Sequence, residues 1–212
     1  MAVFNGTVAA IVDDAQETNN DTGFSSTTGT IAASCSTSSA LATTMGFRWA
    51  NITIPKNSTI SAAIVQLYST AASTDDPALT IYGHKVANSP NFTDTADLVN
   101  RAHTTASVSW IAIGVGAGVY VDSPDITAVI QELVNQASWA SGNAITIIMV
   151  GNGDCVSPKY LVVRAYDTGP GTSPPKIQVT YTAPGAGGKP KGGAKIQRFA
   201  PKRTYYRYGY GP

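Results

Sequence analysis

Charged side chains are scarce in this chain of 212 residues, and they are unevenly placed. Asp, Glu, Lys and Arg make up 13% of the sequence, which is low for a soluble domain. No acidic residue follows Asp167, whereas seven of the 14 Lys and Arg residues lie beyond residue 188. Residues 1–181 thus hold 7 basic and 13 acidic residues, a net charge of −6, and residues 182–212 carry +7.

Long apolar runs are also missing. No stretch of about 18 apolar residues occurs, so we expect no transmembrane helix and no membrane partner. Met1 is followed at once by the strand-like segment 3–8, without the basic and apolar regions of a signal peptide. The sequence therefore predicts synthesis in a cytoplasm.

Cysteine is limited to Cys35 and Cys155. Two thiols at this spacing form no zinc signature. We expect free thiols in a reducing compartment, since a disulfide requires a fold that brings the two Cα atoms within about 7 Å.

Catalytic motifs are absent as well. Neither His84 nor His103 lies in a metal or nucleophile motif, and no Gly-x-Ser-x-Gly turn occurs. Asp122, Asp125 and Glu132 surround a predicted helix, where capping and solvation explain them. We predict that the protein is not an enzyme and needs no cofactor.

Alternating hydrophobic residues dominate the first 182 residues. Met45, Phe47 and Trp49 alternate with small or polar residues, and the segment 59–70 reads as a long strand. In that strand we expect Ala63, Val65 and Leu67 to face away from a set formed by Ile60, Ile64, Gln66 and Tyr68. Further strands are predicted at the start of the chain (Val8, Ala10, Val12) and at 79–84, 144–150, 160–166 and 176–181. Short strands bounded by Gly, Pro, Asn and Asp predict an all-β antiparallel β-sandwich over 1–182.

One short amphipathic helix interrupts this pattern. Ser123 is a candidate cap, Pro124 suits the first helical position and Asp125 complements the positive helix end. The apolar residues that follow have helical spacing: Ile126, Val129, Ile130, Leu133 and Val134. We expect this helix to cover one open end of the sandwich. Residues 21–44, rich in Ser, Thr and Gly, form either a long loop or a small-residue edge strand.

Two groups of residues suggest ligands. Asp13, Asp14 and Glu17, with Asp21 nearby, offer the hard oxygen ligands of a structural Ca²⁺ site; the alternatives are a solvated acidic turn or a docking patch for a basic segment. Trp49, Trp110 and Trp139 could stack on sugars, although core packing explains them more simply.

Residues 183–212 form a Gly/Pro/Lys linker and a basic, Tyr-rich C-terminal arm. The linker composition of 184–193 cannot bury a core. We predict that the arm binds a partner through Lys195, Arg198, Phe199, Lys202, Arg203, Tyr205, Tyr206, Arg207, Tyr208 and Tyr210. A basic aromatic segment suits nucleic acid, but the net charge of −6 on the body favours a neighbouring subunit.

The segment 46–68, from Gly46-Phe47-Arg48-Trp49 through Ile54-Pro55 to Gln66-Leu67-Tyr68, resembles DNRLRE-type β-sandwich domains. Trp110, the start at Asp125, and the closing strand 175–181 fit the same pattern, so the likeness spans about residues 8–181. It implies a jelly roll of the kind found in secreted carbohydrate-binding and adhesive proteins. Asp13-Asp14-Ala15-Gln16-Glu17 is similar to an opening segment of stand-alone structural proteins of tailed bacteriophages.

These observations predict a virion structural protein of a tailed phage. Head decoration (cement) or a neck or tail accessory role is expected, with other virion subunits as partners in a homo-oligomer. The alternative is a carbohydrate-binding module for a host or matrix polysaccharide.

Overall fold

The protein has an all-β body with one short α-helix, as the alternation of the sequence predicts. The computed structural model describes residues 1–18, 23–36, 42–73, 76–94, 97–151, 159–166 and 173–185. Its strands are β1 (Ala2–Thr7), β2 (Asp14–Thr18), β3 (Thr30–Cys35), β4 (Thr43–Trp49), β5 (Thr59–Ser69), β6 (Ala78–Gly83), β7 (Val108–Ile111), β8 (Val119–Asp122), β9 (Ile145–Gly151), β10 (Lys159–Arg164) and β11 (Lys176–Thr182).

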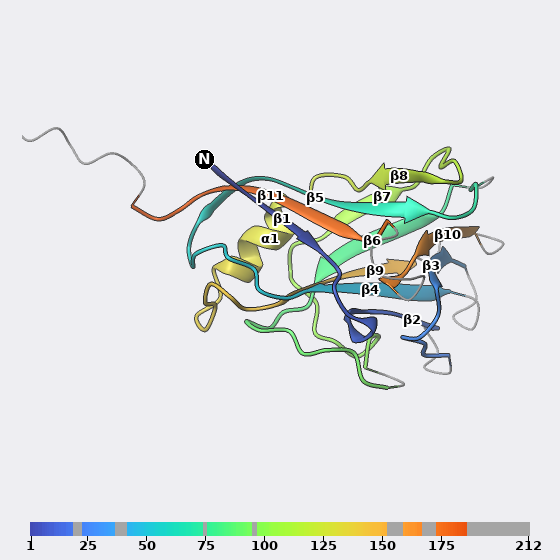
Figure 1. The fold of residues 1–212 in the computed structure, drawn as a ribbon, viewed down its shortest axis with the longest axis horizontal. Helices are drawn as coiled ribbons and strands as arrows, with labels where there is room; N and C mark the ends of the chain where they lie inside the picture. The colour runs from blue at the N-terminus through green and yellow to red at the C-terminus, as the bar shows by residue number, and fades with distance from the viewer. Residues whose placement is uncertain are drawn as a thin grey trace, which may run out of the picture.

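The strands form two layers of a sandwich (Figure 1). One layer has the order β1-β11-β5-β8, and the other contains β4 with β2, β9, β6 and β7. The pair β10–β3 joins them, through single residue pairs to β5 and to β4. Every pairing is antiparallel, and the first strand lies beside the last, as in a jelly roll.

The main core lies between the layers, where alternation places the inward side chains. Met45, Phe47 and Trp49 of β4 are buried, as predicted, and β9 adds Ile145, Ile147 and Met149 from the same layer. The opposite layer contributes its own row: Ala63, Val65 and Leu67 of β5, with Ile177 and Val179 of β11.

Ile60 differs from the prediction. It is 5% exposed and belongs to the core, on the same side as Ala63. The register between β5 and β11 shifts between Thr180 and Tyr181, so an extra residue of β5 is accommodated there. Such a bulge reverses the facing of residues beyond it.

The chain start is also shifted from the prediction. β1 ends at Thr7, and residues 11–13 form a 3₁₀ turn, so Val8, Ala10 and Val12 do not form a strand. Within the small-residue region 21–44, Thr30–Cys35 is a strand paired along its full length with β10.

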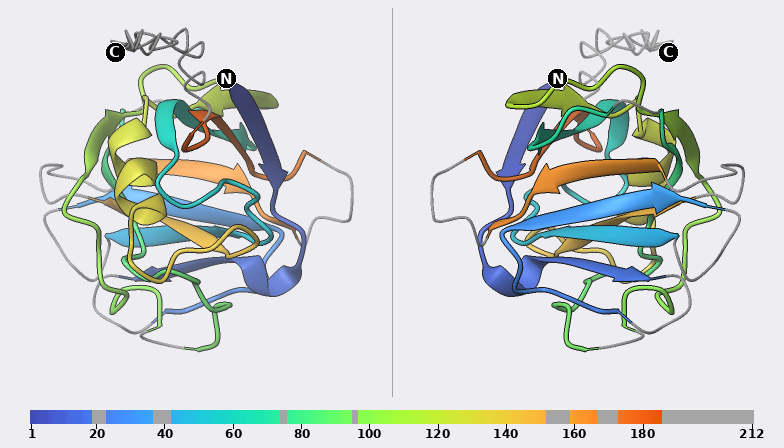
Figure 2. Two further views of the ribbon diagram at one scale, coloured as in Figure 1. Left: turned by 90° about the vertical axis from the view of Figure 1, so that its left-hand side faces the viewer. Right: turned by 90° about the vertical axis from the view of Figure 1, so that its right-hand side faces the viewer.

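Helix α1 (Thr127–Val134) covers one end of the sandwich (Figure 2). Val129, Ile130, Leu133 and Val134 are buried, as their spacing predicts. The predicted cap is wrong, because Ser123 accepts a hydrogen bond from Val65 N–H and so serves the sheet. Asp125 instead accepts bonds from the Thr127 N–H and hydroxyl. No helix in the described residues is long and apolar enough to cross a membrane.

Cys35 is buried and disulfide-bonded. The expectation of a free thiol is therefore wrong for Cys35, because spacing along the sequence gives no measure of distance in the fold. Cys155, the other cysteine of the sequence, lies outside the described residues.

Gly151 of β9 lies against the backbone of β3, where there is no room for a side chain. A Cβ at Gly151 would lie 1.5 Å from the Ser34 carbonyl oxygen, so any side chain must push β9 away from β3. We expect Gly151→Ala to cost about 3 kcal/mol of unfolding free energy, measured by denaturant titration. Gly116→Ala is the control, because its Cβ would meet nothing closer than 3.8 Å. Equal stabilities of the two variants would contradict this account.

Candidate functional site

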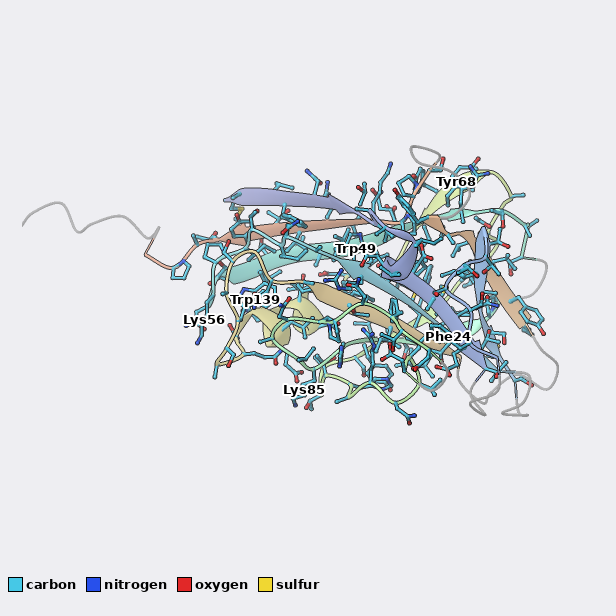
Figure 3. The ribbon with its side chains drawn as sticks, turned by 60° about the horizontal axis from the view of Figure 1, so that its bottom comes forward. Phe24, Trp49, Lys56, Tyr68, Lys85 and Trp139 are labelled. Atoms are coloured by element: carbon cyan, nitrogen blue, oxygen red, sulfur yellow. The ribbon has the colours of Figure 1, made fainter. Side chains whose placement is uncertain are left out.

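The outer faces of the two layers differ. The layer containing β4 is covered by the strap, defined as residues 85–94 and 97–107 between β6 and β7, shown in green along the bottom of Figure 1. The layer β1-β11-β5-β8 has no comparable covering among the described residues. Figure 3 shows Tyr68 of this open layer and Lys85 of the strap on opposite sides of the molecule.

A second, smaller apolar cluster lies beneath the strap. Phe92 and Leu98 of the strap pack against Ala15 of β2 and Ile148 of β9, whose side chains point outward from the sheet. Gly46 makes room for them, since a Cβ there would lie 2.7 Å from Leu98 and 2.8 Å from Phe92. Both faces of β4 are therefore packed.

The buried side chain of Arg101 stabilises the strap through hydrogen bonds. Its side chain is 2% exposed and forms a bidentate pair with Asp97 at 3.1 and 2.8 Å. The remaining N–H groups donate to the backbone oxygens of Pro90 and Asn91, to Ser89 Oγ and to Thr146 Oγ1. The guanidinium also lies 4.2 Å from the centre of the Phe92 ring. A buried cation with all donors used is a structural brace, not a catalyst.

The ionisation of the strap follows from this arrangement. Burial opposes the charge on Asp97, but hydrogen bonds from Arg101 and Thr93 outweigh it and lower the pKa of the carboxyl. The His84 ring contacts Ser89 Oγ through Nδ1 at 2.9 Å. Burial, and then the charge of Arg101, lowers the pKa of His84 to about 4, so the imidazole is neutral at pH 7.

The predicted calcium ligands do not converge. Asp13 pairs with Arg48, whereas Asp14 accepts a bond from the Tyr166 N–H and Glu17 accepts two, from Leu98 and Val99 N–H. Asp14 and Glu17 point to opposite faces of β2, as residues three apart on a strand do. All three are buried, so they form no surface patch for a basic arm. Within the described ranges, no three His, Cys, Asp or Glu side chains gather as metal ligands; Asp21 lies outside them.

The two histidines are neighbours, which their spacing did not reveal. His84 and His103 pair across an isolated β-bridge, and the His103 ring stacks on Tyr82 with centroids 4.4 Å apart. Burial lowers the pKa of His103. His84 contacts the Ser89 hydroxyl, but among the described contacts no carboxylate bonds to either histidine ring.

The open layer carries a row of rings and cations. Tyr68 of β5 and Tyr120 of β8 are paired across the strands and meet edge to face, with centroids 5.4 Å apart. Arg164 lies 4.8 Å from the centre of the Tyr68 ring, and Lys176 Nζ lies 4.0 Å from that of Tyr120. We call these four residues the tyrosine row. All four are partly exposed.

A shallow groove adjoins the tyrosine row. It has a volume of about 650 Å³ and is lined by Thr7, Val8, Ala9, Tyr120, Tyr166, Ser173, Pro174 and Lys176. Tyr120 is fixed at its edge, because its hydroxyl donates to the Pro174 carbonyl oxygen at 3.1 Å. Amide side chains border the row: Gln66 donates to Asp122, and Gln178 donates to Asn5.

This open face is suited to binding. Ring faces, amides and a lysine are the groups that hold polar ligands with apolar surfaces, such as sugars. The tryptophans offer no such platform, since Trp49, Trp110 and Trp139 are 1%, 6% and 3% exposed. Sequence reasoning missed the tyrosine row, although the alternation of β5 placed Tyr68 on an outer face.

The predicted arm residues, Lys195 to Tyr210, lie outside the described residues. No protein-family model matches this chain, and no curated protein matches it. The resemblance to DNRLRE-type domains therefore stays a prediction.

Arg101→Lys tests the brace. Lysine cannot reproduce the planar fork, so the Pro90 and Asn91 carbonyl oxygens lose their donors. We expect a loss of about 1–3 kcal/mol of unfolding free energy in denaturant titration. Lys85→Met is the control, because it removes the partly exposed Lys85–Glu132 pair and should cost less than about 1 kcal/mol. A loss for Arg101→Lys no larger than this would refute the assignment.

Proposed function

We propose that this protein is a non-enzymatic structural protein of a tailed-phage virion that assembles through its basic C-terminal arm. A head decoration (cement) subunit is the first choice, and a neck or tail accessory subunit the second. The division of charge carries the proposal: the body holds −6 and residues 182–212 hold +7. Opposite charges on one chain attract copies of that chain to one another.

The contacts within the body support this reading. Asp13, Arg48, Asp97 and Arg101 are paired with one another or with the strap, and Glu17 holds the strap backbone. These groups serve stability and are not available to a substrate. Acids that do face solvent, Asp94, Asp122 and Asp125, are available to the arm of a neighbour.

The disulfide at Cys35 also agrees with a particle that persists outside a cell. Disulfides endure in oxidising surroundings, and a released virion meets such surroundings. Synthesis in the host cytoplasm and oxidation after release are compatible steps.

Deletion of residues 184–212 tests the proposal. The described core draws no residue from this segment, so the truncated chain should keep its melting temperature. It should lose self-association and particle binding, measured by analytical ultracentrifugation and by co-sedimentation with particles lacking this protein. A full-length variant with the seven basic arm residues changed to Gln separates charge from length and should bind at least tenfold more weakly. Undiminished assembly of the truncated chain would rule the proposal out.

The second candidate is a module that binds an acidic polysaccharide, and the tyrosine row with its groove favours it. Tyr120 offers a ring and Lys176 a cation at the same place. Gln66 and Gln178 provide further polar contacts beside them.

Tyr120→Ala decides whether the groove binds sugar. In affinity electrophoresis with a polyuronate, this variant should lose at least tenfold in affinity, since stacking on one ring is lost. Tyr160→Ala is the matched control, because Tyr160 is 44% exposed on β10 and contributes nothing to the groove. Binding that depends on the arm and not on Tyr120 would instead favour the assembly function.

A further inference from the structure

Strand β1 presents the longest free edge in the described part of the sheet. All six of its residues pair with β11, from Ala2 with Tyr181 to Thr7 with Lys176, and it pairs with no other strand. The other terminal strands β7 and β8 have four residues each. β2 has five, and its Gln16 bonds with Ser25 on the outer side.

The register identifies the backbone groups on this free edge. Val8 N–H donates to the Pro175 carbonyl oxygen at 3.0 Å, which continues the pairing of β1 with β11 by one residue. Hydrogen-bonded residues alternate along an antiparallel pair. The backbone N–H and C=O of Val3, Asn5 and Thr7 therefore point away from β11, and all three residues are exposed.

Nothing in β1 protects this edge. Natural edge strands carry charged residues, proline or bulges that prevent further pairing. The sequence of β1, Ala2-Val3-Phe4-Asn5-Gly6-Thr7, has no charge and no proline, and its register with β11 is regular. Val3 is 55% exposed, and Phe4 packs only partly against the core. An edge of this kind is built to accept a strand.

The arm contains a segment with strand periodicity. Tyr206, Tyr208 and Tyr210 alternate with Tyr205, Arg207 and Gly209, so residues 204–210 can present an aromatic face with period two. Its seven residues match the six of β1 in length. Tyrosines on the inner side of an added strand would cover the exposed side of Phe4.

The position and length of the arm permit this contact. The chain leaves β11 beside the start of β1, since Tyr181 pairs with Ala2. Eighteen residues lie between Gly185 and Thr204, and they span up to roughly 60 Å when extended. This is enough to leave one body and reach the edge of the next.

We propose that residues 204–210 of one subunit add as an extra strand to the β1 edge of a neighbouring subunit. This inference rests on the proposed function and names the surface that receives the arm. Main-chain hydrogen bonds to Val3, Asn5 and Thr7 hold the segment, while the basic residues before it meet acidic groups elsewhere on the neighbour.

Asn5→Pro in the full-length protein tests the inference. Proline removes the N–H on the free edge and leaves the bonds of Phe4 and Gly6 to β11 in place. Self-association measured by analytical ultracentrifugation should weaken at least tenfold relative to Asn5→Ala, which loses the same side chain but keeps the N–H. Equal association of the two variants would overturn the inference. If Asn5→Pro melts at a lower temperature than Asn5→Ala, Val3→Lys decides, with Val3→Thr as its control.

Hydrogen exchange separates this inference from the proposed function. In the assembled wild-type protein, the amides of Val3, Asn5 and Thr7, which point away from β11, should exchange at least tenfold more slowly than in the variant Tyr206→Ser/Tyr208→Ser/Tyr210→Ser. If deletion of the arm abolishes assembly but these three amides exchange equally fast in the wild-type protein and in the triple Ser variant, the arm binds elsewhere and only the inference fails. If the wild-type protein is a monomer with β1 already protected by its own arm, the contact between subunits is refuted.

Discussion

The covered half of the molecule depends on one buried cation. The Arg101 guanidinium contacts six oxygen atoms, from Asp97, Ser89, Pro90, Asn91 and Thr146. Four of these five residues belong to the strap. Most hydrogen bonds of Arg101 therefore lie within the strap itself, and only the bond to Thr146 reaches the sheet. Without that cation, the Pro90 and Asn91 carbonyl oxygens would lose this donor, and the strap over β4 and β9 would be held less firmly.

The strap makes the two outer faces of the sandwich different. The outer face of β4 and β9 is covered by the strap, because Phe92 and Leu98 pack against Ile148 and over Gly46. The other outer face keeps its polar and aromatic side chains partly exposed, and no strand of the described residues pairs with the outer edge of β1. The side of β1, β11, β5 and β8 is therefore the one from which we propose that partners approach. Both the tyrosine row and the β1 edge lie on this side.

Local patterns in the sequence were enough to predict part of this structure. Met45, Phe47 and Trp49, and the helical spacing from Val129 to Val134, predicted their own burial because alternation and helical periodicity are properties of short segments. Ile60 was misplaced, because a bulge depends on the partner strand. Asp13, Asp14 and Glu17 read as a surface cluster, since the sequence does not show the distant groups that they contact in the fold: Arg48 for Asp13, the Tyr166 amide for Asp14 and the strap backbone for Glu17. The tyrosine row joins residues from β5, β8, β10 and β11, and only the fold brings them together.

The pairing of β11 has a mechanical consequence. The arm continues directly from β11, which is bonded to β1 on one side and to β5 on the other. A pull on the end of β11 along the strand would load β11 along its own axis. The hydrogen bonds to both neighbours run across that axis, so they share the load together and do not open one after another. If a neighbour holds the arm, as we propose, a load in this direction is the one that the sheet resists best.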